Sequence, residues 1–140
     1  MNTISNIQSI YFVGIGGIGM SALARFAIKK NLAVFGYDKT QTALTATLEK
    51  EGADITFEDS VSSLPPKVKN NTSTLVVYTP AIPDDNKILQ WFTQQDYRVI
   101  KRSEFLGELT QDTLCLAVAG THGKTTTSAI LGHLLAYCDM

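Results

Sequence analysis

Short apolar runs alternate with longer stretches of helical periodicity along most of the chain. The runs are rich in β-branched and aromatic residues and stop at glycine, aspartate or proline, as buried strands do. We therefore expect strands at 9–15, 32–38, 74–80 and 97–102, and a shorter one near Ile55. Helical patterns lie between them, at 18–30, 42–52, roughly 84–95 and 103–109. This alternation is typical of an α/β fold with a Rossmann-like parallel sheet flanked by helices.

The first helical stretch separates into two faces. A polar stripe recurs every four residues at Ser21, Arg25 and Lys29. The opposing face, which we expect to be buried, consists of Ile18, Ala22, Leu23, Phe26 and Ala27.

Local signals predict where several helices begin and end. Gly52 is suited to close the 42–52 helix, and Asp84 or Asp85 to begin the next, since acidic side chains favour a helix N-terminus. Ser103 is the expected cap of the helix at 103–109. Two prolines and two asparagines in 62–74 predict a loop with neither a helix nor a central strand.

A second unit is predicted after a linker at 110–113. The apolar run `LCLAVAG` at 114–120 predicts a fresh strand, and a helical pattern follows at 125–138. Taken alone, that helix exposes an apolar face, so we expect it either to pack back on the first unit or to pair with a second copy. The residues of this face are Ile130, Leu131, Leu134 and Leu135.

Composition narrows the class of protein. The 140 residues carry a net charge of −1, which provides no basic footprint for nucleic acid and no polybasic arm for a membrane. The start has no basic n-region, and its apolar run is broken by glycines, so neither a signal peptide nor a membrane span is expected. Two cysteines make neither a disulfide framework nor a zinc cluster. We therefore expect a cytoplasmic protein.

The first glycine cluster has the form G-x-G-x-x-G, with Gly14, Gly16 and Gly19 between a predicted strand and a predicted helix. Such a loop lets backbone N–H groups approach a phosphate at the positive end of a helix. Asp38 closes the next strand, where a carboxylate commonly accepts from a ribose hydroxyl. A diphosphate ligand is favoured, an NAD-dependent oxidoreductase is one option, and glycines that serve packing alone are another.

Two further segments bear on ligands. Thr79 and Pro80 follow a predicted parallel strand, at the edge where ligands bind in open α/β sheets, although the prolines of this segment could simply shape a turn. The second segment, `GTHGKTTT`, matches a phosphate loop in which Lys124 offsets phosphate charge and Thr125 ligates Mg²⁺. Val118 stands where the common spacing has glycine, so the loop is a shorter variant that begins at Gly120. His122 could touch phosphate or be structural, and His133 is expected to flank or join the helix core.

The motifs together resemble the Mur ligases of peptidoglycan synthesis, and among them most closely the member that adds L-alanine. The residues that carry the resemblance are `YFVGIGGIGMSALA`, `GYD`, `TPAIPDDN`, `KRSEFLGEL` and `AVAGTHGKTTT`. The resemblance implies a UDP-binding domain at residues 1–112 and, at 113–140, the first strand, phosphate loop and helix of a truncated ATPase domain. The implied UDP-sugar residues are Gly14, Ile15, Gly16, Gly17, Ile18, Gly19, Asp38, Thr79, Pro80, Ala81 and Ile82.

The resemblance also implies a reaction. ATP would phosphorylate the lactyl carboxylate of UDP-N-acetylmuramic acid, and the amine of L-alanine would displace the phosphate. Lys124 would be catalytic by stabilising phosphate charge, and Thr125 would hold Mg²⁺. The implied ATP-binding residues are Gly120, Thr121, His122, Gly123, Lys124, Thr125 and Thr126.

Three alternatives to this ligase stay open. One is a paralogue that attaches a recycled peptide to the same UDP-sugar. The others are the oxidoreductase and a non-catalytic nucleotide-sensing module. Because amino-acid specificity and the remaining Mg²⁺ ligands would lie beyond residue 140, we expect these residues alone to be inactive.

Overall fold

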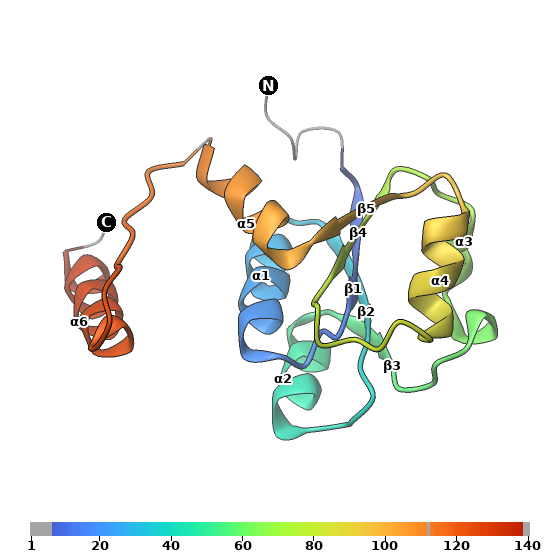
Figure 1. Cartoon of the computed structure of the whole chain (residues 1–140), viewed down its shortest axis with the longest axis horizontal. Helices are drawn as coiled ribbons and strands as arrows, with labels where there is room; N and C mark the ends of the chain where they lie inside the picture. Colours follow the sequence, from blue (N-terminus) through green and yellow to red (C-terminus); the bar gives the residue numbers. More distant parts are fainter. Residues whose placement is uncertain (1–6, 112, 139–140) are drawn as a thin grey trace.

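The computed structural model describes residues 7–111 and 113–138, and it confirms the α/β class (Figure 1). Five parallel strands form one sheet in the order β3-β2-β1-β4-β5. The strands are β1 (Ser9–Val13), β2 (Ala33–Tyr37), β3 (Asp54–Thr56), β4 (Thr74–Tyr78) and β5 (Arg98–Lys101). All five expected strands of the first unit are therefore present.

Helices cover both faces of the sheet, as Figure 1 shows. They are α1 (Ile18–Lys29), α2 (Ala43–Glu51), α3 (Pro66–Lys69), α4 (Lys87–Gln94), α5 (Arg102–Gln111) and α6 (Lys124–Tyr137), with a 3₁₀ turn η1 (Val61–Ser63). Alternate residues of β1 enter two separate cores, because successive strand side chains point to opposite faces. Ile10 and Phe12 pack with α1, α2 and α5, whereas Tyr11 and Val13 pack with α3 and α4.

The buried face of α1 differs from the expected one. Its buried residues are Met20, Ser21, Leu23, Ala24 and Ala27. Ser21, expected in the polar stripe, is buried and donates its hydroxyl hydrogen bond to the Ile18 carbonyl at 2.9 Å. Ile18 and Ala22, expected to be buried, are exposed. The helix packs on α2 as well as on the sheet, which shifts the contact face around its axis.

Two helix starts also differ from expectation. Helix α4 begins at Lys87 with Asn86 as its N-cap, and neither Asp84 nor Asp85 has that position. Helix α5 begins at Arg102, directly after β5, so Ser103 lies inside the helix and does not cap it. The helix also runs through Thr110 and Gln111, half of the expected linker, and Asp112 lies outside the described residues.

The expected loop at 62–74 contains a short helix, so that prediction was wrong. Pro66 is the first residue of α3, a position where the missing N–H of proline costs nothing. Val68, which is fully buried in the core under α4, holds the helix against the sheet. The expected end of α2 is confirmed, because Gly52 adopts a left-handed φ of 112°.

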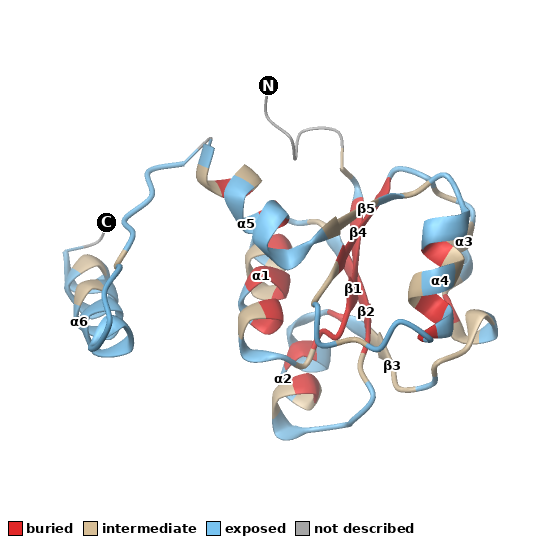
Figure 2. Cartoon of the chain, viewed as in Figure 1, coloured by how far each residue is buried: buried red, intermediate tan, exposed pale blue. Residues whose placement is uncertain are grey.

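The segment at 114–120 is extended but forms no strand, which contradicts the expected opening of a second sheet. A β-strand exists only when its backbone groups pair with a neighbouring strand, and no neighbour is present among the described residues. Helix α6 forms as expected, but none of its residues is buried (Figure 2). It lies away from the sheet, so the expectation that it packs back on the first unit was wrong.

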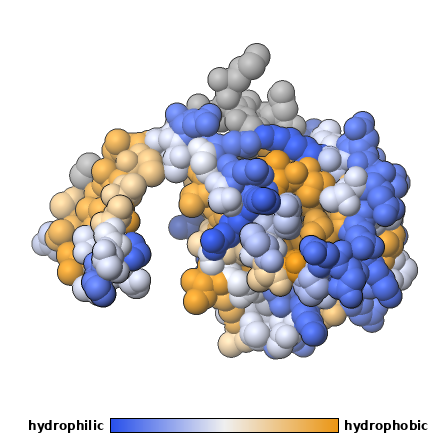
Figure 3. All heavy atoms as spheres, viewed as in Figure 1, coloured by the Kyte–Doolittle hydropathy of each residue, from blue (hydrophilic) through white to orange (hydrophobic). Residues whose placement is uncertain are grey.

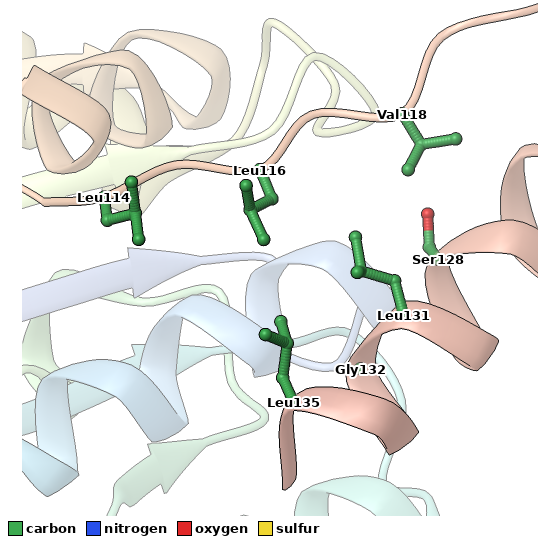
Figure 4. A pocket seen from close by; sticks show the side chains of 7 residues that line it. All are labelled: Leu114, Leu116, Val118, Ser128, Leu131, Gly132 and Leu135. Carbon is green, nitrogen blue, oxygen red and sulfur yellow. The ribbon is translucent and has the colours of Figure 1, made fainter. Parts of the chain in front are cut away.

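The apolar side of α6 faces the extended segment that precedes it. Leu114, Leu116 and Val118 alternate along one side of that segment and lie opposite Leu131 and Leu135 of α6 (Figure 4). Together they line a groove of about 610 Å³. Ile130 and Leu134 lie outside the groove and are 57% and 53% exposed, and Figure 3 shows the hydrophobic surface that results. His133 is exposed on the flank of the helix.

Candidate nucleotide-binding site

The candidate site lies at the carboxyl ends of the two central strands. Strands β1 and β4 pair side by side, yet β1 leads into α1 on one face and β4 leads towards α4 on the other. At such a switch point the two connections diverge and leave a crevice beyond the sheet edge. The glycine cluster follows β1, and the segment from Thr79 to Asn86 follows β4.

Gly14 makes the turn out of β1. Its φ of 89° lies in the left-handed region, and a Cβ there would come within 2.7 Å of the Thr79 Cγ2 atom. The N–H groups of Gly14 and Ile15 both donate to the Tyr37 carbonyl, at 2.7 and 3.0 Å. Ile15 directs its side chain into the core and is fully buried. Glycine at position 14 is thus required by both conformation and space.

Asp38 fixes the shape of the loop. Its Oδ2 accepts from the Gly16 N–H at 2.8 Å, and its Oδ1 accepts from the Thr40 N–H at 3.1 Å. A Cβ at Gly16 would lie 2.8 Å from that same Oδ2, so the close approach requires glycine. Each carboxylate oxygen retains a further lone pair, so a ribose hydroxyl could still be accepted. Asp38 therefore has a structural role that the sequence did not suggest.

The N-terminus of α1 has no acidic residue of its own, and the carboxylate beside it is that of Asp38. Its N-cap is Gly17, without a side-chain cap, and its first turn contains no acidic residue. The Arg102 guanidinium lies over this turn, because a Cβ at Gly19 would overlap its Nη1 atom. A helix N-terminus and a guanidinium both favour an anion. Arg102 was not among the predicted site residues, although the quoted motif `KRSEFLGEL` contains it.

A cavity of about 670 Å³ opens between these loops, a size suited to a small-molecule ligand. Of the residues expected from sequence, the cavity lining includes Gly14, Gly17, Asp38, Thr79, Ala81 and Ile82. The lining does not include Ile15, Gly16, Ile18, Gly19 or Pro80. The remaining lining residues were not among the predicted site residues, although the quoted motifs `GYD` and `TPAIPDDN` contain four of them; they are Tyr37, Lys39, Asp59, Pro83, Asp85 and Asn86.

Two of the missed residues shape the electrostatics of the cavity. Burial raises the pKa of Tyr37, and the carboxylates of Asp59 and Asp38 raise it further, so the phenol stays neutral. Asp59 accepts from the N–H groups of Lys87 and Ile88, both at 3.1 Å, and so offsets the positive end of α4.

The second glycine loop forms a turn that leads into α6. Gly120 and Gly123 have positive φ values of 153° and 77°, and Gly123 is the N-cap of the helix. The Lys124 ammonium donates to the Gly120 carbonyl at 2.7 Å and to the Thr121 carbonyl at 3.4 Å. Thr125 and Thr126 lie exposed in the first turn, and His122 is exposed in the loop. The loop thus places an ammonium, hydroxyls and free amides at one helix end.

The described residues contain neither a cluster of metal ligands nor a membrane-spanning helix. No group of three His, Cys, Asp or Glu side chains within 7–111 and 113–138 is arranged to hold a metal ion. In that same part of the chain, no helix is both long and apolar enough to cross a bilayer.

Sequence comparison places these features in a known family. Residues 9–113 match the model described as the Mur ligase family, catalytic domain. A UDP-N-acetylmuramate--L-alanine ligase of Christiangramia forsetii is 51% identical over 136 residues, 96% of this chain and 30% of that protein. A protein of the same name from Parabacteroides distasonis is 52% identical over 94% of this chain and 29% of its own length. The chain therefore spans about 30% of the length of these relatives.

Solved structures agree with the sequence comparison. A UDP-N-acetylmuramate-alanine ligase from Thermotoga maritima is similar with a TM-score of 0.82 and 33% identity, over 94% of this chain and 30% of its own. A murein peptide ligase from Psychrobacter arcticus is similar with a TM-score of 0.81 and 29% identity, over 94% of this chain and 27% of its own. Because the family match covers well over half of the sequence, this chain belongs to the Mur ligase family.

Proposed function

We propose that this chain contributes the UDP-binding part of an ATP-dependent ligase that joins L-alanine to UDP-N-acetylmuramic acid. The observation that carries the proposal is the cavity between the Gly14–Gly19 loop and the 79–86 segment. It has a glycine turn and a helix end for a diphosphate, with Asp38 beside them for a ribose, and Arg102 lies outside its lining, over the first turn of α1 at Gly19. The names of relatives about 50% identical support the substrate and the amino acid.

The loop at 120–126 fits an ATP site. Backbone amides at the start of α6 would cradle phosphates, and the Lys124 ammonium would turn from its loop carbonyls to a phosphate. The Thr125 hydroxyl would be one ligand of Mg²⁺, which would neutralise phosphate charge. Relatives are more than three times as long as this chain, which leaves room for further ligands outside it. Because ATP is the expected co-substrate, we expect the reaction in the cytoplasm.

We also propose a domain boundary near residue 112. The sheet and its helices would form the UDP-binding domain, and 113–140 would begin the ATP-binding domain. The burial of side chains supports this boundary, because none of the described residues from Thr113 onward is buried. The unpaired segment 114–120 would become a strand once a neighbour pairs with it.

The murein peptide ligase is the second candidate, because its structure is as similar to this chain as that of the alanine ligase. The first glycine loop would serve either enzyme. Sequence identity favours the alanine ligase, since proteins of that name are about 50% identical to this chain, against 29% for the peptide ligase. An oxidoreductase has no comparable support.

Calorimetric titration with UDP-N-acetylmuramic acid tests the proposed ligand, with NADH titrated in parallel. We expect heat with the UDP-sugar, a binding constant at least about tenfold weaker for Asp38→Ala, and no heat with NADH, since the variant removes the acceptor that orders the Gly16 amide. Binding of NADH without binding of the UDP-sugar would refute the proposal. A polypeptide of these 140 residues is expected to release no phosphate from ATP in the presence of L-alanine.

A further inference from the structure

We draw no further inference here: the strongest candidate, the apolar groove of about 610 Å³ between the extended segment at 114–118 and α6, lies within the unit already proposed to begin the ATP-binding domain, and nothing in the structure shows what fills it.

Discussion

Tyr11 has a hydroxyl that the fold does not use. The residue is fully buried against Phe92, and its hydroxyl has no hydrogen-bond partner in the described part of the chain. Burial, and to a lesser extent the carboxylate of Asp54, raises the pKa of Tyr11, so the group stays neutral at any physiological pH. Tyr97 differs, since its hydroxyl lies 2.7 Å from the Val68 carbonyl and 2.9 Å from the Lys69 carbonyl and donates to them.

We expect a Tyr→Phe substitution to change the free energy of unfolding in opposite directions at these two positions. Tyr11→Phe removes an unsatisfied buried group and should raise the free energy of unfolding by about 1 kcal/mol, whereas Tyr97→Phe should lower it by about 1 kcal/mol. Urea denaturation of the two variants measures both values. An equal loss of stability in both would show that the Tyr11 hydroxyl does have a partner.

We expect the neighbouring glycines Gly16 and Gly17 to tolerate substitution by alanine unequally. A Cβ at Gly16 would meet Asp38 Oδ2 at 2.8 Å and Thr45 Cγ2 at 3.0 Å, whereas a Cβ at Gly17 has no atom closer than 3.6 Å. Gly16→Ala should therefore cost about 1–3 kcal/mol by overpacking, and Gly17→Ala less than about 0.5 kcal/mol. Urea denaturation again provides the comparison, and equal costs would mean that Asp38 yields easily to the added methyl.

At the scale of elements, α4 is capped by a residue from far along the chain. Asp59 supplies acceptors for the amides of Lys87 and Ile88, and Asn86 supplies one for Leu89. Three of the four free amides of the first turn are thus satisfied by side chains. Asp59→Ala should lower the free energy of unfolding by about 1–2 kcal/mol.

Asp85→Ala is the matched control, because Asp85 is exposed and its side chain makes no hydrogen bond with the described residues. Its free energy of unfolding should stay within about 0.5 kcal/mol of the wild type. If both variants lose the same stability, the effect comes from net charge near α4 and not from the cap.

Elements whose signals are local were predicted well from the sequence. The runs that became β1, β2 and β4 are apolar on both faces because helices cover both sides of the sheet. The glycine turn and Asp38 were found because their motif lies within adjacent elements. The buried face of α1 and the position of Arg102 were missed, since each depends on contacts between distant segments. The strand expected at 114–120 failed for the same reason, because it has no partner. The start of α4 was misplaced by one or two residues although its cap, Asn86, is local.

At the scale of the whole molecule, the tail from residue 113 contributes little to the folded sheet domain. Helix α6 buries none of its residues, and Leu114, Ile130, Leu134 and Tyr137 are more than half exposed. Deleting residues 113–140 should therefore leave the urea midpoint of the sheet domain unchanged. A large drop in that midpoint would mean that the tail packs on the sheet.

We propose that two copies of the chain associate through the apolar face of α6, since exposed apolar patches commonly mark interaction sites. The same deletion tests this self-association. Sedimentation velocity of the full chain should show a concentration-dependent dimer that the truncated chain lacks. A full chain that stays monomeric across the accessible concentrations would exclude pairing through α6.

The extended segment at 113–120 also limits how far the two glycine loops can separate. Eight residues span at most about 30 Å when fully extended, so the second loop always lies within that distance of the end of α5. A short linker of this kind keeps the second loop at an effective concentration of about the millimolar range relative to the first. A nucleotide held at one loop would therefore meet the other far more often than free diffusion allows, even though no described residue of α6 is buried.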